Sequence, residues 1–438
     1  MFSDPLVIAI FGMLLMFGLI FLHVPIGISL TLTGVLGCAM YIGWDPAFSL
    51  IEIEASNVIS NDSLALVSIF LVMASFARAA DLSTDIYRLA FALVGHWRGG
   101  LAMATVAACG GFGAICGSSV ATTAAMGKIA IPEMLKRNYS PSFAAGVVAS
   151  SGTLGILIPP SSLMILYAVL TEQFILALFA AALLPGLLTI AYYFIAVYAY
   201  VKISPDSAPP AEKLSWAERW AIIRSTWRVV LTAGVVSGGL YTGVFTVNET
   251  ASIGAATTLF FAIERNRITL KQFFDCLLDA ASSTCLIFVI VIGAHIFAYF
   301  ITLTQLPAEL VGFITDAQLH PLVVIFWLMV MYLILGSIFD TVASMVITLP
   351  FVFPLITGMG YDPIWWGVVM VIVMEIGMIT PPIGINVFVL NSVASELSLS
   401  QIYKGITPFF CADLLRLATI ILIPAISLWL PHAIGYKF

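Results

Sequence analysis

The chain has 438 residues, of which 61% are hydrophobic and only 9% are charged, whereas an average soluble domain is about 25% charged. A net charge of −6 without a basic block argues against a nucleic acid partner, and the polar stretches are too short for a soluble catalytic or ATP-binding domain. The composition therefore predicts an all-α polytopic membrane protein that lies in a lipid bilayer and is not an enzyme.

Apolar runs that resemble the roughly 20-residue spans of a bilayer recur along the chain. We expect helices at 6–22, 26–43, 63–80, 141–171, 174–200, 229–247, 250–264, 276–303, 365–395 and 406–430.

Basic residues set the expected orientation, because short loops rich in Lys and Arg stay in the cytoplasm. They cluster at 78–98, 128–137, 202–228 and 265–271, whereas the segments 44–62, 248–250, 304–320 and 357–364 carry acidic residues without Lys or Arg. This pattern predicts a cytoplasmic linker over 201–228 and both termini outside, with Lys437 as the only basic residue on the outer face. The linker contains the proline-rich segment Lys202–Lys213, and the Trp- and Arg-rich stretch behind it is typical of an interfacial helix.

Two further apolar stretches, 99–131 and 321–356, are too long for simple spans. As single helices they would extend about 44 Å and about 54 Å, against about 30 Å for the hydrocarbon core. Basic segments flank the first stretch and acidic segments flank the second. We therefore expect two re-entrant helical hairpins that enter from opposite faces, turn at 113–119 and 336–340, and leave a site between their tips.

A helix interrupted by a proline pair follows each hairpin: 141–171 contains Pro159-Pro160, and 365–395 contains Pro381-Pro382. The glycines and prolines of these helices align at an offset of 222, and Pro132 aligns with Pro350 at an offset of 218. The second alignment sets Ser118 beside Gly336 and Thr122 beside Asp340. We therefore expect inverted repeats, 1–200 and 229–438, which are typical of a secondary transporter.

Proline pairs free backbone carbonyls, and these oxygens together with Ser and Thr hydroxyls suit a small cation. One such set is predicted in each half: Ser118, Ser119, Gly155, Ile158 and Pro160 in the first, and Gly336, Ser337, Gly377, Thr380 and Ile383 in the second. Ile158 occupies the place of Thr380 and offers only its carbonyl, so we do not expect equal affinity at the two sites.

Asp340 and Glu375 lie inside apolar runs, where an ionised carboxylate is costly unless it is paired or faces water. They are candidates for cation attraction, gating or proton coupling, and the alternative is a hydrogen-bonded structural carboxylate. Asn386 could contact substrate or cap freed backbone, and Ser161 lies in the same vicinity. Asp413 and Arg416 are expected to pair with each other on one helix.

Five motifs resemble the large membrane subunit of tripartite ATP-independent periplasmic (TRAP) transporters, the DctM-like family. They are Gly95–Leu101, Gly117–Ala121, Gly155–Ser161, Gly336–Asp340 and Glu375–Gly384, in the expected order along nearly the whole chain. The resemblance implies a sodium symporter of the bacterial or archaeal inner membrane, which takes up organic acids by an elevator movement of a transport domain against a scaffold domain.

The resemblance further implies that the two oxygen sets bind sodium as the coupling ion and that no other cofactor is needed. It implies two partners, a small four-helix membrane subunit and a periplasmic binding protein that delivers the substrate. The main rival is a stand-alone sodium- or proton-coupled organic-anion transporter of related architecture. A channel is a weaker rival, and a membrane-embedded enzyme is the weakest, because no nucleophile–base or metal constellation is apparent in the sequence.

Overall fold

The computed structural model describes residues 5–210 and 214–436, so Lys213 and Lys437, on which part of the charge argument rests, lie outside the described residues. Within these ranges the chain is helical and contains no β-strand. Six helices are long and apolar enough to cross a membrane, and a seventh span is obtained if the bent pair Pro141–Leu157 and Ser162–Thr171 is counted as one. The predicted all-α class is confirmed.

The first half contains eleven α-helices up to the linker. They are α1 (Pro5–Phe21), α2 (Ile26–Ile42), α3 (Trp44–Ile59), α4 (Asp62–Ala79), α5 (Leu82–Val94), α6 (Gly100–Cys116), α7 (Ser119–Lys136), α8 (Pro141–Gly152), α9 (Leu154–Leu157), α10 (Ser162–Leu170) and α11 (Ile175–Ile203).

A short 3-10 turn (Pro205–Ser207) lies in the linker, and the remaining helices follow. They are α12 (Trp216–Ser225), α13 (Trp227–Ala233), a π-helical turn (Gly234–Gly238), α14 (Gly239–Tyr241), α15 (Val247–Glu264), α16 (Leu270–Leu303), α17 (Leu306–Asp316), α18 (Pro321–Ile338), α19 (Thr341–Gly358), α20 (Pro363–Gly377), α21 (Ile385–Val393), α22 (Leu399–Leu422) and α23 (Ala425–Ala433).

Several predicted boundaries are wrong. The segments now seen as α3, α5 and α17 were expected to be connections, because their charges were counted while their helical periodicity was not. The expected helix 229–247 is interrupted by the π-helical turn, and the expected helix 406–430 is two helices that separate before Pro424.

The chain breaks within both predicted turns. Gly117 and Ser118 separate α6 from α7, and Phe339 and Asp340 separate α18 from α19. The starts of α7 and α19 differ by 341 − 119 = 222 residues, and the starts of α8 and α20 differ by 363 − 141 = 222 residues. The predicted offset of 218 for the hairpins is therefore wrong, and Ser118 corresponds to Asp340 rather than to Gly336.

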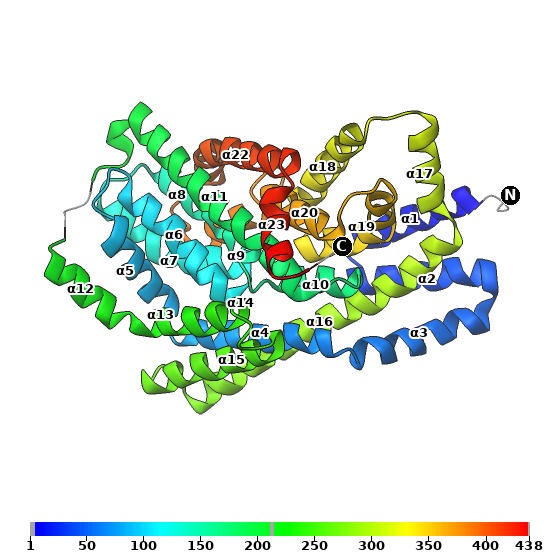
Figure 1. The fold of residues 1–438 in the computed structure, drawn as a ribbon, viewed down its shortest axis with the longest axis horizontal. Coiled ribbons are helices and arrows are strands. Elements are labelled where there is room, and N and C mark those ends of the chain that lie inside the picture. The colour runs from blue at the N-terminus through cyan, green and yellow to red at the C-terminus, as the bar shows by residue number, and fades with distance from the viewer. Residues whose placement is uncertain (1–4, 211–213, 437–438) are drawn as a thin grey trace.

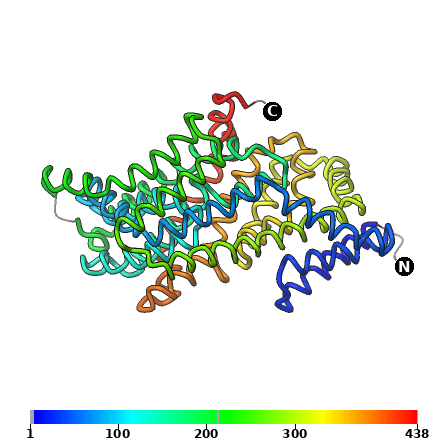
Figure 2. Tube along the Cα trace, turned by 90° about the horizontal axis from the view of Figure 1, so that it is seen from below, coloured from blue at the N-terminus to red at the C-terminus, as the bar shows by residue number. Residues whose placement is uncertain are grey.

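The elements behind the two breaks pack against the opposite half. Figure 1 shows α2, α3, α4, α15 and α16 along one side of the molecule, with α1–α3 at one end and α5 and α12 at the other. Away from that side, α10 packs against α19 and α20 of the second half, whereas α21 packs against α7 and α8 of the first. In the rotated view the two termini lie well apart (Figure 2). Each proline-pair break is therefore followed by a helix that packs against the other half.

Candidate functional site

The tip of the first hairpin is closed by its own polar groups. Gly117 ends α6 with a φ of 62°, a left-handed conformation that favours glycine. The Ser118 hydroxyl then caps α7 by accepting from the Ala121 amide at 3.4 Å. The Thr122 hydroxyl donates to the Ser118 carbonyl at 2.8 Å. These contacts hold an oxygen-rich turn at the tip.

The first interrupted helix lies directly on this tip. A Cβ atom on Gly155 would be 2.5 Å from Thr122 Oγ1 and 2.6 Å from the Ser118 carbonyl oxygen, so only glycine fits there. The Ser162 hydroxyl donates to the Gly117 carbonyl at 3.1 Å on the far side of the proline pair. The structure therefore brings Ser118 and Gly155 together, as the sequence predicts.

The backbone leaves the helical conformation at the break, and the residues 158–161 are buried. Ile158 ends α9 in an extended conformation with φ −80° and ψ 120°, and Ser161 caps α10 by accepting from the Met164 amide at 3.3 Å. A Cβ atom on Gly117 would be 2.8 Å from the Pro160 carbonyl oxygen, so that carbonyl points at the hairpin tip. Carbonyl and hydroxyl oxygens at such a break are ligands of the type that sodium uses.

In the second half the hairpin and the broken helix also lie in contact. A Cβ atom on Gly377 would be 2.7 Å from Cα of Gly336, so α20 lies against the end of α18. The Gly384 amide donates to the Ser337 carbonyl at 3.0 Å. The hydroxyls of Thr380 and Ser337 donate to carbonyls of their own helical turns, Ile376 at 2.6 Å and Ile334 at 2.8 Å respectively. The lone pairs of these two hydroxyl oxygens stay available to coordinate a cation.

The carbonyl of Ile383 has a partner that sequence reasoning missed. Tyr403, on α22, donates its hydroxyl to this carbonyl at 2.6 Å. A lone tyrosine on another helix carries no local signal that could have revealed the contact. Any ion held by Ile383 would share the carbonyl with Tyr403.

Asn386 joins the two halves. Its side-chain amide donates to the Ser119 hydroxyl at 2.6 Å, and both residues are fully buried. The side-chain oxygen of Asn386 accepts no hydrogen bond from any residue that the structure describes. Because a buried polar atom without a partner is uncommon, this oxygen is available to a bound ligand. Ser119, which is predicted to belong to the first site, therefore also contacts the second half.

The two conspicuous carboxylates have different surroundings. Asp340 is exposed at the second break, where it caps α19 by accepting from the Val342 amide at 3.2 Å. Glu375 is fully buried on α20 and lies 3.8 Å from Nη1 of Arg416. Sequence reasoning expected Arg416 to pair with Asp413, and this pair is present at 3.1 Å. The additional approach to Glu375 was missed, because it joins different helices.

A second unpredicted pair lies away from the tips. His295 of α16 contacts Glu54 of α3, with Nδ1 and Oε2 2.9 Å apart. The segment 44–62, which contains Glu54, was expected to be an external connection. Because the two residues lie on different helices far apart in the chain, the sequence gives no indication of their partnership.

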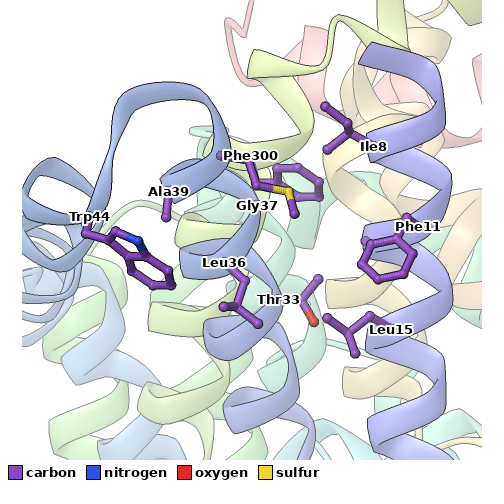
Figure 3. Close-up of a pocket in the computed structure, with 11 residues that line it drawn as sticks. Ile8, Phe11, Leu15, Thr33, Leu36, Gly37, Ala39, Trp44 and Phe300 are labelled. Atoms are coloured by element: carbon purple, nitrogen blue, oxygen red, sulfur yellow. The ribbon is translucent and has the colours of Figure 1, made fainter. Parts of the chain in front are cut away.

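A groove at the end of the molecule is separate from this site. It has a volume of about 290 Å³ and runs between α1 and α2, with Phe300 of α16 at its side (Figure 3). Its lining consists of Ile8, Phe11, Gly12, Leu15, Thr33, Leu36, Gly37, Ala39, Met40, Trp44 and Phe300. The Thr33 hydroxyl and the Trp44 indole N–H are the polar side-chain groups in this lining, and none of the lining side chains is charged, so the groove is mainly apolar.

Known proteins resemble the chain along most of its length. The model of a family described as the tripartite ATP-independent periplasmic transporter, DctM component, matches residues 13–426. The C4-dicarboxylate TRAP transporter large permease protein DctM of Pseudomonas aeruginosa is 36% identical over 85% of this chain and 87% of its own. The protein of the same name from Vibrio cholerae is 33% identical over 95% and 96%.

A solved structure shares the fold. The transporter MtrF of Neisseria gonorrhoeae, which belongs to a class of antimetabolite efflux pumps, superposes with a TM-score of 0.61. The match covers 97% of this chain and 95% of MtrF at 13% sequence identity. An identity this low concerns the fold alone.

Proposed function

The chain belongs to the DctM family of tripartite ATP-independent periplasmic transporters and is a large permease subunit, and we propose that it imports organic acids across the inner membrane in symport with sodium. C4-dicarboxylates are the first candidates, because the relatives described above carry that name. The family match disfavours the stand-alone transporter, and the similarity to MtrF is a similarity of fold.

One observation supports sodium coupling above the others. In each half a hairpin tip lies against a proline-pair break, through Ser118 and Gly155 in the first and Gly336 and Gly377 in the second. Each contact gathers carbonyl and hydroxyl oxygens without a carboxylate pair, which fits a monovalent hard cation better than a divalent one. In this proposal sodium binds at both contacts before the organic anion arrives.

The proposed movement is of the elevator type. The hairpins and broken helices form the transport domain, and α2, α4, α15 and α16 belong to the scaffold along which it slides. The halves 1–200 and 229–438 are inverted repeats joined by a cytoplasmic linker, and both termini lie in the periplasm. The recurrence of helix boundaries at an offset of 222 supports the duplication.

The partners follow from the family. A small membrane subunit completes the membrane part of the transporter, and a periplasmic binding protein delivers the substrate. Because the binding protein selects the substrate, the permease site needs only to recognise an anion next to bound sodium.

Uptake into proteoliposomes tests this proposal. The permease is reconstituted with its small subunit, the cognate binding protein is added outside, and labelled succinate is supplied with an inward sodium gradient. Accumulation should require both partners and collapse when choline replaces sodium. Accumulation without the binding protein would support the stand-alone transporter instead, and accumulation independent of sodium would reject the coupling ion.

A further inference from the structure

A fully buried ionic network joins α20, which carries part of the second predicted sodium site, to α22 and α11. Arg416 on α22 lies 3.1 Å from Asp413 and 3.8 Å from Glu375, and it donates to the Thr189 hydroxyl at 2.7 Å. The hydroxyl of Tyr193 on α11 donates to both carboxylate oxygens of Asp413, at 3.0 and 2.9 Å. The side chains of all five residues are at most 1% exposed.

Glu375 connects this network to both breaks. It lies on α20, two residues before Gly377 of the second oxygen set. This helix packs against α9, whose last residue, Leu157, directly precedes Ile158 of the first set. Glu375 therefore lies on a helix that carries part of the second set and also contacts the helix that ends at the first break.

Arg416 reaches the first half by a second route. Thr189 and Tyr193 belong to α11, and the hydroxyl of Tyr193 lies 3.4 Å from the Ser150 carbonyl on α8. Ser150 precedes the turn at Thr153 from which α9 and Gly155 continue. Two sets of contacts therefore link α20 to the first break, one through α9 and one through Arg416 and α11.

We propose that Arg416 is a positioning residue that couples the two sodium sites through Glu375, so that sodium at one break favours sodium at the other. The inference rests on the proposed function, since it presupposes both sites. A guanidinium suits this role because its planar fork holds several oxygens in fixed directions at once.

The charge count of the network makes a clean variant possible. Two carboxylates share one guanidinium in a region without water access, and buried charge is costly unless it is balanced. Glu375→Gln leaves Arg416 and Asp413 as a one-to-one pair and keeps the side-chain volume. The unfolding midpoint of this variant in sodium-free buffer should be no lower than that of the wild type. The coupling between the two sodium sites should be lost.

A double-mutant cycle measures the coupling without transport. The midpoint of thermal unfolding of purified permease in detergent is titrated with sodium, using choline to hold ionic strength constant, which gives the half-saturating sodium concentration. Ser118→Ala perturbs the first set and Thr380→Val the second, separately and together. In the wild-type background the change in half-saturating sodium concentration of the double variant should differ about threefold or more from the product of the two single changes. In the Glu375→Gln background the double variant should equal that product.

Two further variants complete the test. Arg416→Lys keeps the charge but loses the fork, so it should also abolish the non-additivity. Thr258→Val is the matched control, because Thr258 is buried on α15 and bonds only within its own helix; it should preserve the wild-type coupling.

The outcomes separate this inference from the function beneath it. Non-additivity that persists in Glu375→Gln, or that is absent from the wild type, overturns the coupling role while the sodium sites stand. If neither Ser118→Ala nor Thr380→Val changes the sodium titration, the predicted side-chain ligands are wrong, and the coupling inference falls with them.

Discussion

At the scale of single residues, two glycines have no room for a side chain. A Cβ atom on Gly155 would lie 2.5 Å from Thr122 Oγ1, and one on Gly377 would lie 2.7 Å from Gly336, whereas a Cβ atom on Gly18 of α1 would meet nothing within 4 Å. Separations below about 3 Å force the backbone to move, and overpacking typically costs about 1–3 kcal/mol. The tip and the break of each half are therefore held at the closest possible approach.

Replacing either glycine should separate tip and break. We expect Gly155→Ala and Gly377→Ala to lower the unfolding midpoint and to raise the half-saturating sodium concentration about tenfold, which corresponds to about 1.4 kcal/mol. Sodium-dependent thermal unfolding measures both quantities. Gly18→Ala is the control and should change neither; an unchanged sodium titration in both site variants would exclude these contacts as the ion sites.

The Ser118 hydroxyl has two roles that can be distinguished. As the cap of α7 it contributes about 0.5–2 kcal/mol of stability, and as a ligand it would also contribute to sodium affinity. Ser118→Ala should therefore lose both stability and sodium affinity. Ser398→Ala removes the cap of α22, which is an exposed capping box, and should lose stability alone. Equal sodium titrations of the two variants would assign Ser118 a capping role only.

Asp340 offers a similar distinction. Because Asn caps a helix as well as Asp does, Asp340→Asn should fold and assemble normally while removing the charge at the second break. If that charge attracts sodium before the organic anion binds, the variant should lose sodium-driven uptake in proteoliposomes. Full uptake by Asp340→Asn at limiting sodium would leave Asp340 as the cap of α19 and nothing more.

At the scale of elements, the exchange of α10 and α21 between the halves was not predicted. Gly and Pro mark where a helix stops, so the breaks at Gly117 and at the proline pairs could be located from the sequence. The direction in which the chain continues after a break depends on tertiary packing, which the local helix propensity of the residues does not contain. Pro132 and Pro350 misled the hairpin alignment because both lie inside helices, where they do not mark the turn.

A disulfide tests this exchange. Asn386 of α21 and Ser119 of α7 are hydrogen-bonded at 2.6 Å, so cysteines at both positions should lie within bonding reach. In a background without the six native cysteines, Ser119→Cys/Asn386→Cys should crosslink under a mild oxidant, which mass spectrometry of a tryptic digest detects. Ser119→Cys/Ser392→Cys is the control, since Ser392 is exposed on the same helix; crosslinking of the control alone would contradict the packing.

At the scale of the whole molecule, composition and loop charge predict the membrane class and an orientation. They could not reveal the Glu375–Arg416 approach or the pair of His295 with Glu54, because long-range partners leave no periodic trace in a single sequence. The chain breaks at which the two oxygen sets lie were predictable, because Gly and Pro mark them; the role of these oxygens as sodium ligands stays a prediction. Tyr403, which shares the Ile383 carbonyl, was not predictable.

Orientation can be measured by labelling single cysteines in intact cells with a membrane-impermeant maleimide. The Gln318→Cys variant, between α17 and α18, should be labelled from outside. The Asp206→Cys variant, in the linker, should be labelled only after the membrane is permeabilised. Basic residues around the linker support this assignment. External labelling of Asp206→Cys would show that the orientation predicted for both hairpins is wrong.

The central claim is that each contact between a hairpin tip and a proline-pair break holds one sodium ion, and binding of ²²Na⁺ to the purified permease tests it most directly. The account predicts saturable binding that unlabelled sodium displaces and potassium does not. Gly155→Ala and Gly377→Ala should each weaken sodium binding in their own half about tenfold, and Gly18→Ala should retain full binding. Undiminished sodium binding in both Gly155→Ala and Gly377→Ala would contradict the account.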